Sequence, residues 1–352
     1  MKNTRLSRFL SGKIFQLLCL IIVVVAITYI VKPTAFNRMN LRQLMNNITN
    51  VMIFVCAVSP LLLCGAIDWS GSAIAICGML TFALLLWQFP DIPWPIMLIP
   101  ALLVGSILGY INSLFIVKLN LVAFIVTMVM AIVWSRTAQW IMESRPVMIS
   151  NKSFYDLSSI ALFNVIPLFF ILAVVLIALA SFILMKTEFG RSVLMCGGNS
   201  AAARLAGLNP NRVKTILFVS SGCVATIAGL VYAAQYRMAT HMAFAIGTPP
   251  HMGAFTGSII GGVSMFGGTG SLASAAMGVA LAQLLSYALT SMGANNWVSG
   301  LLNGMLLIIA MSIDSFTRSM MLRRLGVKTS GTRMEKLIAI LLVLCAAFTL
   351  YA

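Results

Sequence analysis

Long uninterrupted blocks of apolar residues fill most of the chain, and short polar stretches separate them. The blocks are roughly 17 to 25 residues long, which is the length that a helix needs to cross a bilayer. They do not alternate apolar and polar residues, as the strands of a membrane barrel would. The pattern predicts helical membrane spans at 14–31, 47–64, 72–88, 96–117, 121–142, 163–185, 215–236, 271–291 and 297–316.

One further segment, near 252–267, is apolar but irregular. It holds Gly253, Gly257, Gly261 and Gly262, and it follows Pro249-Pro250. These residues favour a broken or partly re-entrant helix that lines a cavity. If the segment crosses the membrane, the chain is an all-α polytopic membrane protein of about 10 transmembrane helices. Breaks of this kind often mark a transport path.

The two ends of the chain differ in character. The run 14–31 is long for a signal-peptide core and no small-residue cleavage site follows it, so we expect a retained span. We expect one transmembrane domain over 1–316, followed by a basic cytoplasmic segment and a hydrophobic helix over 317–352. The last apolar run, 337–352, is short for a span, so it either crosses barely or lies along the membrane interface.

Composition and charge agree with a membrane protein. Hydrophobic residues make up 61% of the 352 residues and charged residues 9%, and the mean hydropathy is +1.02. The net charge of +16 does not indicate nucleic-acid binding, because the basic residues sit between spans, where the positive-inside rule expects them. A cytoplasmic amino terminus places 16 basic residues inside and six outside: Lys32, Arg38, Arg42, Arg145, Lys152 and Arg237.

The chain lacks the groups that an enzyme or an ion-coupled transporter uses. The seven acidic residues are scattered, only two histidines occur, and the seven cysteines have no metal-ligand spacing. We find no nucleophile elbow, zinc helix or phosphate loop. We therefore expect no enzyme activity, metal or bound cofactor. A transporter without mid-span carboxylates is either driven by another subunit or is a passive pore.

The longest polar island runs over 190–210, between two apolar blocks. Ser200 is a candidate N-cap, 201–206 a short helix and Gly207 a left-handed C-cap, and Pro210 prevents the helix from resuming. The island thus predicts a rigid, basic helix on the membrane face. A merely solvated basic loop is the alternative.

Several ordered motifs resemble one family. The strongest are Phe189-Gly190-Arg191, the run 197–207, and the run 259–271, which reads Ile-Ile-Gly-Gly-Val-Ser-Met-Phe-Gly-Gly-Thr-Gly-Ser. Weaker ones are 65–70, 109–112 and 124–127. Over about 41–316 the chain resembles the membrane permease subunits of ribose-type importers driven by ATP-binding-cassette (ABC) ATPases, a group that includes sugar and autoinducer-2 permeases.

The resemblance implies a function and partners. In that family the loop equivalent to 186–214 is the coupling segment, which docks on a separate ABC ATPase subunit. The ATP is bound by that partner. The expected coupling residues are Gly190, Arg191, Gly198, Asn199, Ser200, Ala203, Arg204 and Gly207. The resemblance further implies a periplasmic or extracellular substrate-binding protein and a second permease subunit, identical or related, in the lipid of the bacterial plasma (inner) membrane.

The solute would pass between the two permease copies. The resemblance and the irregular segment suggest that the path is lined by Asp68, Trp69, Asn112, Thr127, Gly257, Gly261, Gly262 and Ser264, although helix packing would also explain these small or polar residues. The implied function is transport of a monosaccharide or similar small polar solute. The alternatives are an ATPase-independent channel or facilitator and, less in keeping with the scattered acids, a membrane-embedded enzyme.

This chain departs from the family pattern at three places. The paired glycine before Ile67-Asp68 is Gly65-Ala66 here. An acidic pair common before the broken helix is replaced by His251 and Gly253, and an arginine of the glycine turn is replaced by Thr269. These changes suggest either a diverged partner in a heterodimer or a transporter of a different small polar solute.

Overall fold

We describe the protein from a computed structural model. The described residues are 13–244, 249–295, 298, 300–301, 304–312 and 315. Eight of the described helices are long and apolar enough to cross a membrane, which confirms an all-α polytopic membrane protein. They are α2 (Lys13–Val31), α3 (Arg38–Leu63), α4 (Gly71–Gln88), α5 (Trp94–Lys118), α6 (Ala123–Ile141), α8 (Leu168–Lys186), α11 (Pro210–Tyr236) and α13 (Leu272–Ser291).

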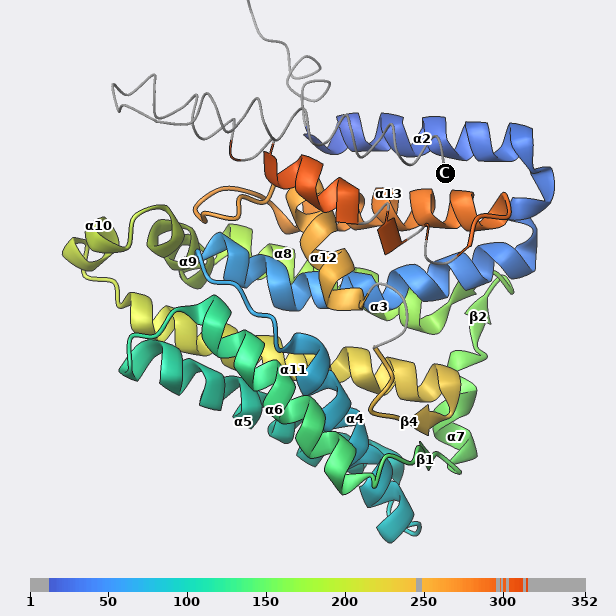
Figure 1. The fold of residues 1–352 in the computed structure, drawn as a ribbon, viewed down its shortest axis with the longest axis horizontal. Helices are drawn as coiled ribbons and strands as arrows, with labels where there is room; N and C mark the ends of the chain where they lie inside the picture. Colours follow the sequence, from blue (N-terminus) through green and yellow to red (C-terminus); the bar gives the residue numbers. More distant parts are fainter. Residues whose placement is uncertain are drawn as a thin grey trace, which may run out of the picture.

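The spanning helices run between two ends of the molecule (Figure 1). One end, which we name the α10 end, carries the short helices α9 (Glu188–Gly198) and α10 (Ser200–Leu205). The other, the hairpin end, carries α7 (Lys152–Tyr155) and two small antiparallel pairs. In these pairs β1 (Val147–Met148) joins β4 (Met238–Ala239), and β2 (Ala161–Leu162) joins β3 (Ile166–Pro167). Short 3-10 turns, η1 (Pro33–Phe36) and η2 (Asp156–Ser158), complete this end.

Three predicted span starts are wrong by several residues. The span predicted from residue 215 begins at Pro210, which is the first residue of α11 because the Asn209 side chain caps that helix. The helix predicted at 47–64 begins at Arg38, because the Asn37 side chain caps it by accepting from the Asn40 amide at 2.8 Å. Its polar first turns are tied to the hairpin end, where Arg42 donates to the Ser159 carbonyl at 2.6 Å. The span predicted from residue 163 begins at Leu168, since 161–167 form the β2–β3 hairpin.

The irregular segment crosses the molecule, as predicted. It starts at β4 on the hairpin end, and α12 (Pro250–Ile260) forms its only helix within the described residues. The following turn reaches the α10 end, where the Gly268 amide donates to the Leu63 carbonyl oxygen at 2.8 Å. The segment 297–316 is only partly described, and 317–352 lies outside the described residues.

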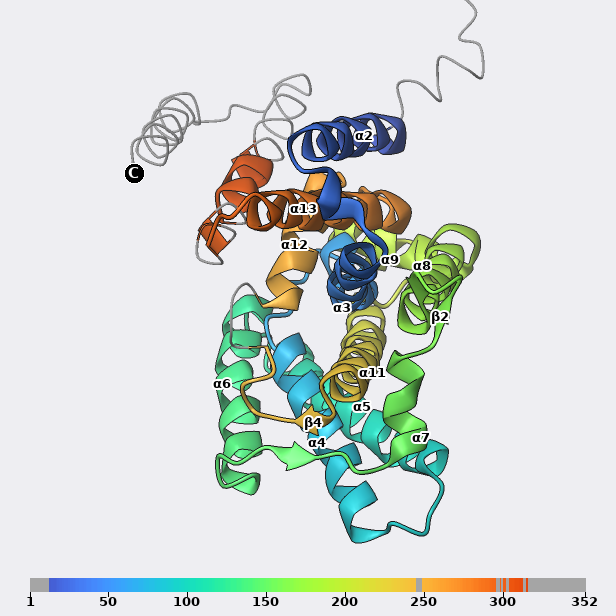
Figure 2. The same cartoon turned by 90° about the vertical axis from the view of Figure 1, so that its right-hand side faces the viewer.

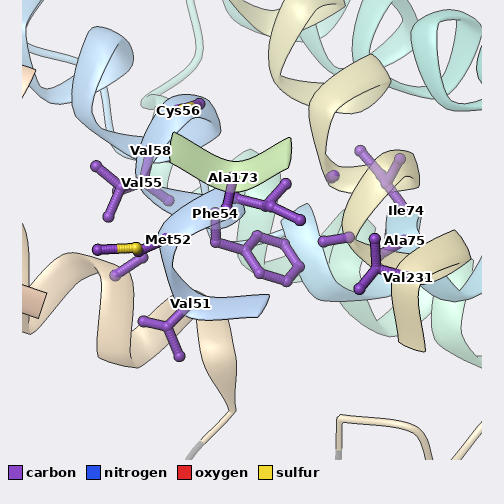
Figure 3. Close-up of a cluster of buried hydrophobic side chains, with 14 of the residues drawn as sticks. Val51, Met52, Phe54, Val55, Cys56, Val58, Ile74, Ala75, Ala173 and Val231 are labelled. Atoms are coloured by element: carbon purple, nitrogen blue, oxygen red, sulfur yellow. The ribbon is translucent and has the colours of Figure 1, made fainter. Parts of the chain in front are cut away.

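The helices α3 and α11 form the centre of the fold. Figure 2 shows them in the middle, with α8 on one side and α6 and α12 on the other. The Phe54 ring of α3 is fully buried and points toward Ile74 and Ala75 of α4 and Val231 of α11 (Figure 3). Burial of this large ring between three helices fixes their relative positions.

Small residues let α11 approach α5 closely. A Cβ on Gly222 would lie 2.1 Å from the Gly105 carbonyl oxygen, and a Cβ on Gly109 would lie 2.2 Å from the Phe218 carbonyl oxygen. Gly105 and Gly109 are one helical turn apart, so they present one flat face, which is typical of membrane helix pairs. This backbone contact fixes the position of α11 against α5, and therefore the position of the α9–α10 segment that precedes α11.

Candidate functional site: the coupling segment and its glycine junction

The coupling segment consists of two short capped helices. Thr187 caps α9, where its hydroxyl accepts from the Gly190 amide at 3.3 Å. Asn199 caps α10, where its Oδ1 accepts from the Ala201 and Ala202 amides at 3.0 Å each. The N-cap is therefore Asn199 and not Ser200, which is the first helical residue. Asparagine and serine are equally good caps by type, so the sequence alone does not separate neighbours.

Gly207 ends α10 as predicted. Its φ of 81° is left-handed, and its amide donates to the Arg204 carbonyl oxygen at 3.0 Å. The Leu208 amide donates to the Ala203 carbonyl oxygen at 3.0 Å. Asn209 then caps α11 by accepting from the Arg212 amide at 3.1 Å. Successive caps at Asn199, Gly207 and Asn209 satisfy the helix ends and make the segment a defined element rather than a loose loop.

The α10 helix has a buried and an exposed side. Ala203 is 1% exposed and packs inward, whereas Leu205 is 92% exposed. Arg204, Ser200 and Gly198 are also exposed. Leu205 and its exposed neighbours give this end a candidate contact surface.

The predicted residues of α9 serve different roles. Gly190 is buried, and a Cβ there would lie 2.0 Å from the Leu184 carbonyl oxygen, so glycine is needed for the sharp corner between α8 and α9. Arg191 is exposed, and its guanidinium lies 3.8 Å from the Glu188 carboxylate in an exposed pair. Such a pair contributes little stability, so the guanidinium remains accessible to another charge.

The end of α9 meets two glycine turns next to the coupling segment. We name this contact the glycine junction; its residues are Gly65, Gly197, Gly267 and Gly268. A Cβ on Gly197 would lie 1.8 Å from the Leu63 carbonyl oxygen, and one on Gly268 would lie 2.7 Å from Gly198 Cα. A Cβ on Gly267 would lie 2.8 Å from the Gly65 amide nitrogen. The end of α9, the turn after α3 and the turn after α12 therefore touch backbone to backbone.

Two buried thiols flank the junction. Burial raises the pKa of the Cys64 thiol to about 11, with the Lys214 ammonium acting in the opposite direction. Burial also raises the pKa of Cys196, and Lys214 again opposes the change. Both side chains are under 5% exposed. The two thiols are therefore packed away from solvent, although Gly65 of the junction is exposed and Gly197, Gly267 and Gly268 are partly buried.

The chain leaves the junction through 64–70 and reaches a buried hydrogen-bond network. The Asp68 carboxylate is 3% exposed and accepts from the Ser70 amide at 2.9 Å, the Ser70 hydroxyl at 2.6 Å and the Ser221 hydroxyl at 3.0 Å. Asn112 donates to the Ser70 hydroxyl at 2.7 Å, and Trp134 donates to the Asn112 amide oxygen at 3.3 Å. The network joins α4, α5, α6 and α11.

The other predicted path residues have varied positions. Thr127 is fully buried, and its hydroxyl accepts from the Trp69 amide at 3.0 Å. The Trp69 side chain is half-buried and lies against Phe124, Phe255 and His251. The structure thus gathers Asp68, Trp69, Asn112 and Thr127 around one loop, mostly as partners of other protein groups. That they line the solute path stays a prediction.

The predicted glycines of the broken helix pack against α13. A Cβ on Gly257 would lie 2.3 Å from Val279 Cγ2, and one on Gly261 would lie 2.3 Å from the Ser274 carbonyl oxygen. Gly262 is exposed with a φ of 89°, and the Ser264 amide donates to the Thr269 carbonyl oxygen at 3.0 Å in the following turn. Gly257 lies within α12, whereas Gly261, Gly262 and Ser264 belong to the turn that reaches Leu63 at the α10 end.

Sequence reasoning did not single out the contact between Gly197 and the Gly267-Gly268 pair. Both lie inside the motifs that carry the resemblance, but residues 70 positions apart reveal no contact by spacing alone. The usable signal was the repeated glycine pair, since adjacent glycines commonly mark close backbone approach. Within the described residues, no group of three or more His, Cys, Asp or Glu could hold a metal ion.

Comparison with known proteins identifies the family. Residues 43–311 match the family described as the permease component of the branched-chain amino acid transport system. The chain is 26% identical to the ribose import permease protein RbsC of Haemophilus influenzae over 319 residues, which cover 89% of this chain and 96% of that relative. No solved structure matches.

Two further relatives extend the picture. The probable ABC transporter permease protein y4mJ of Sinorhizobium fredii is 27% identical over 288 residues, covering 82% of this chain and 84% of the relative. The fructose import permease protein FrcC of Rhizobium meliloti is 26% identical over 332 residues, covering 89% of each chain.

The fold and the match together define the class of protein. The chain belongs to the permease-component family of the branched-chain amino acid transport system. It is a multi-pass membrane permease of the ABC importer type and not an enzyme, as the sequence predicted. Membership of this family implies that the chain acts together with an ATPase subunit and a substrate-binding component.

Proposed function

We propose that this chain forms the translocation path for a monosaccharide or similar small polar solute. The names of the relatives support this solute class, since two of those described above are a ribose and a fructose import permease. The polar groups that contact Trp69, Thr127 and His251, suit a solute without charge, since the adjacent Asp68 carboxylate is engaged by Ser70 and Ser221. We further propose that a periplasmic or extracellular binding protein delivers the solute and that two permease subunits share the path.

One observation carries the proposal that a separate ABC ATPase drives transport. The capped α9–α10 segment ends in an exposed Leu205, and its other side contacts two turns through backbone atoms at the glycine junction. One turn leads to Asp68 and α4, and the other belongs to the α12–α13 segment. A displacement of α10 would be transmitted through backbone contacts to both turns, and so to α4 and to the α12–α13 segment. A self-sufficient channel has no evident need for such a link.

The proposed orientation puts the α10 end in the cytoplasm. Lys13, Lys118, Lys186, Arg191, Arg204, Arg212 and Lys214 lie at or next to this end in the described part of the chain. The positive-inside rule then places the amino terminus in the cytoplasm and the hairpin end outside, in a bacterial plasma (inner) membrane. The cationic end would contact anionic lipid headgroups of that leaflet.

Leu205→Glu tests the coupling proposal. Ala203→Glu is less informative, because Ala203 is 1% exposed and a carboxylate there would disturb α10 itself. Leu205 is 92% exposed, so the change leaves the permease folded and places an unpaired charge in the ATPase contact. We expect the ATPase subunit encoded with the permease to be lost from the purified complex, or to be retained at least ~10-fold less.

A matched control variant is Met39→Glu. Met39 is 80% exposed in the first turn of α3, at the hairpin end, so the chemical change is the same on the opposite side. This variant should keep the ATPase. A complex that survives Leu205→Glu, or that is lost equally with Met39→Glu, would contradict the assignment. Solute flux through vesicles holding the permease alone would favour the channel alternative.

A further inference from the structure

Four buried polar side-chain atoms have no hydrogen-bond partner in the described part of the chain: Asn50 Oδ1, Gln235 Nε2, His241 Nδ1 and His251 Nε2. Asn50 is 8% and His251 7% exposed. Native proteins pair almost all such atoms, because an unpaired buried polar group is costly. The four residues come from α3, α11, the turn after β4 and α12.

Hydrogen bonds tie three of these residues to neighbouring helices. Asn50 Nδ2 donates to Gln235 Oε1 at 3.0 Å, which joins α3 to α11. The side-chain amides of Asn50 and Gln235 can each be turned by about 180°, which exchanges oxygen and nitrogen. The pair then still forms one hydrogen bond and still leaves one donor and one acceptor unpaired. His251 Nδ1 bonds to the Ser72 hydroxyl, which joins α12 to α4 and leaves Nε2 free to accept or donate according to the tautomer.

Aromatic rings join the two polar pairs. The His251 ring lies 5.5 Å from Trp69 and 6.5 Å from Phe54, centroid to centroid. The Phe54 ring lies 5.7 Å from Phe244, and Phe244 lies 5.1 Å from Tyr232, one turn before Gln235. His241 lies in the same turn as Phe244. We name the set the Asn50 cluster: Asn50, Phe54, Trp69, Tyr232, Gln235, His241, Phe244 and His251.

The chemistry of the Asn50 cluster suits hydroxyl groups. It offers an acceptor, a donor and an imidazole nitrogen of either kind beside aromatic faces, and each hydroxyl of a sugar can both donate and accept. The cluster itself contains no Asp, Glu, Lys or Arg. The nearby Arg237 guanidinium lies 4.4 Å over the Tyr155 ring and is therefore engaged elsewhere. The Asp68 carboxylate next to Trp69 is already bound by Ser70 and Ser221, so a charged solute would be desolvated here without a free counter-charge.

We propose that the Asn50 cluster is a solute-contact site for a neutral polyhydroxylated molecule, at the part of the path nearer the hairpin end. Asn50, Gln235 and His251 bind its hydroxyl groups, and Trp69 covers an apolar face of the ring. The inference rests on the proposed sugar-transport function and assigns residues to it. It also gives a partner to the unpaired Nε2 of His251.

The first experiment measures binding to the full-length permease in detergent. D-ribose, D-fructose and L-leucine are titrated while tryptophan fluorescence is followed in the wild type and in Trp69→Phe. We expect both sugars to change the emission of the wild type, with no change in Trp69→Phe. A response to L-leucine instead of the sugars overturns the solute class. A wild type that responds to none of the three overturns the site.

The second experiment removes the unpaired groups. The double variant Asn50→Leu/Gln235→Leu deletes both amides together, so no new buried atom is left alone. We expect the sugar concentration for half response to rise about tenfold, as the loss of two neutral hydrogen bonds implies. The matched control is Ser59→Ala/Ser258→Ala, which removes a fully satisfied 2.8 Å hydrogen bond between α3 and α12. The control should bind as the wild type does.

A second variant and a separate assay of ATPase retention distinguish a lost sugar site from a destabilised protein. His251→Phe is the second variant if the double variant melts at a much lower temperature than the wild type, and it should weaken sugar binding while preserving the ring packing. Equal affinity in wild type, double variant and His251→Phe overturns the proposal. Retention of the ATPase subunit is measured separately, so the loss of the sugar site and the failure of the coupling assignment are distinguishable.

Discussion

Gly268 donates its amide hydrogen to the Leu63 carbonyl oxygen at 2.8 Å, and Gly197 lies against the same oxygen. Residues from three distant parts of the chain therefore share one point of contact. A backbone contact of this kind is stiff, since no side-chain rotation can absorb a displacement. Motion of the coupling segment would move the ends of α3 and α12 together.

Gly197→Ala should disrupt this contact. The new Cβ would lie 1.8 Å from the Leu63 carbonyl oxygen and 2.8 Å from the Gly268 amide nitrogen, so backbone must shift. We expect a loss of about 1–3 kcal/mol in unfolding free energy. Uptake per ATP hydrolysed should also fall. Thermal unfolding in detergent and coupled uptake in vesicles measure the two effects.

The neighbouring glycine supplies the control for this prediction. A Cβ on Gly198 would meet nothing closer than Gly268 Cα at 3.9 Å, which is ordinary contact. Gly198→Ala should therefore change stability by less than about 0.5 kcal/mol. Equal behaviour of the two alanine variants would show that the junction does not depend on close backbone approach.

Asp68→Leu and Asp68→Asn separate a structural role from a transport role. Leucine leaves the Ser70 amide and the Ser70 and Ser221 hydroxyls without their acceptor, so we expect a loss of about 2–4 kcal/mol. Asparagine keeps one oxygen for Ser70 and offers its amide to the Ser221 hydroxyl. Its cost should be under about 1 kcal/mol.

Melting temperature and uptake together decide between the roles of Asp68. A purely structural carboxylate predicts that Asp68→Asn melts and transports like the wild type. If Asp68→Asn is stable but inactive, the charge itself is used during transport, and the path assignment gains support. An Asp68→Leu variant as stable as the wild type would show that the buried network contributes little.

The sequence predicts the spans well because bilayer crossing imposes a length and an apolar composition on each helix. The boundaries at Arg38, Leu168 and Pro210 were missed for local reasons. Asn209 caps α11 at Pro210, ahead of the apolar run that marked the span. Arg42 finds carbonyl partners at the hairpin end, so polar residues extend α3, while 161–167 fold into a hairpin that composition does not reveal. Helix caps and short hairpins depend on such individual hydrogen bonds rather than on periodicity.

The candidate site was predictable only in part. The island at 190–210 and its left-handed Gly207 follow from residue type, and the short helix is present within one residue of the expected cap. Two features could not be predicted. The burial of Ala203 depends on how α10 packs, and the meeting of Gly197 with Gly268 depends on the tertiary fold.

Alkaline pH should destabilise the protein through Cys64. Its pKa is raised to about 11 by burial, against an ordinary value of 9.0. Below pH 9 the thiol is neutral in both folded and unfolded chains, so its contribution is fully present. Between pH 9 and about 11 the thiol ionises only in the unfolded chain, and stability therefore falls as pH rises through this window.

Thermal unfolding in detergent between pH 7 and the alkaline limit measures this effect. The variant Cys64→Ala lacks the titrating group and should show a shallower decline above pH 9. Lys214→Met should raise the pKa of the thiol further, because the ammonium lowers it in the wild type. Identical pH profiles for wild type and Cys64→Ala would show that other groups cause the alkaline loss.

The contact between α5 and α11 sets how firmly the coupling segment is held, and Gly222→Val tests it. A Cβ on Gly222 would lie 2.1 Å from the Gly105 carbonyl oxygen, so valine forces the helices apart and separates Gly109 from the Phe218 backbone as well. We expect a loss of about 3 kcal/mol or more, at the upper end for overpacking. The control is Cys223→Val, since Cys223 is adjacent on α11 but half-exposed. A Gly222→Val variant that melts at the wild-type temperature would contradict close backbone packing between these helices.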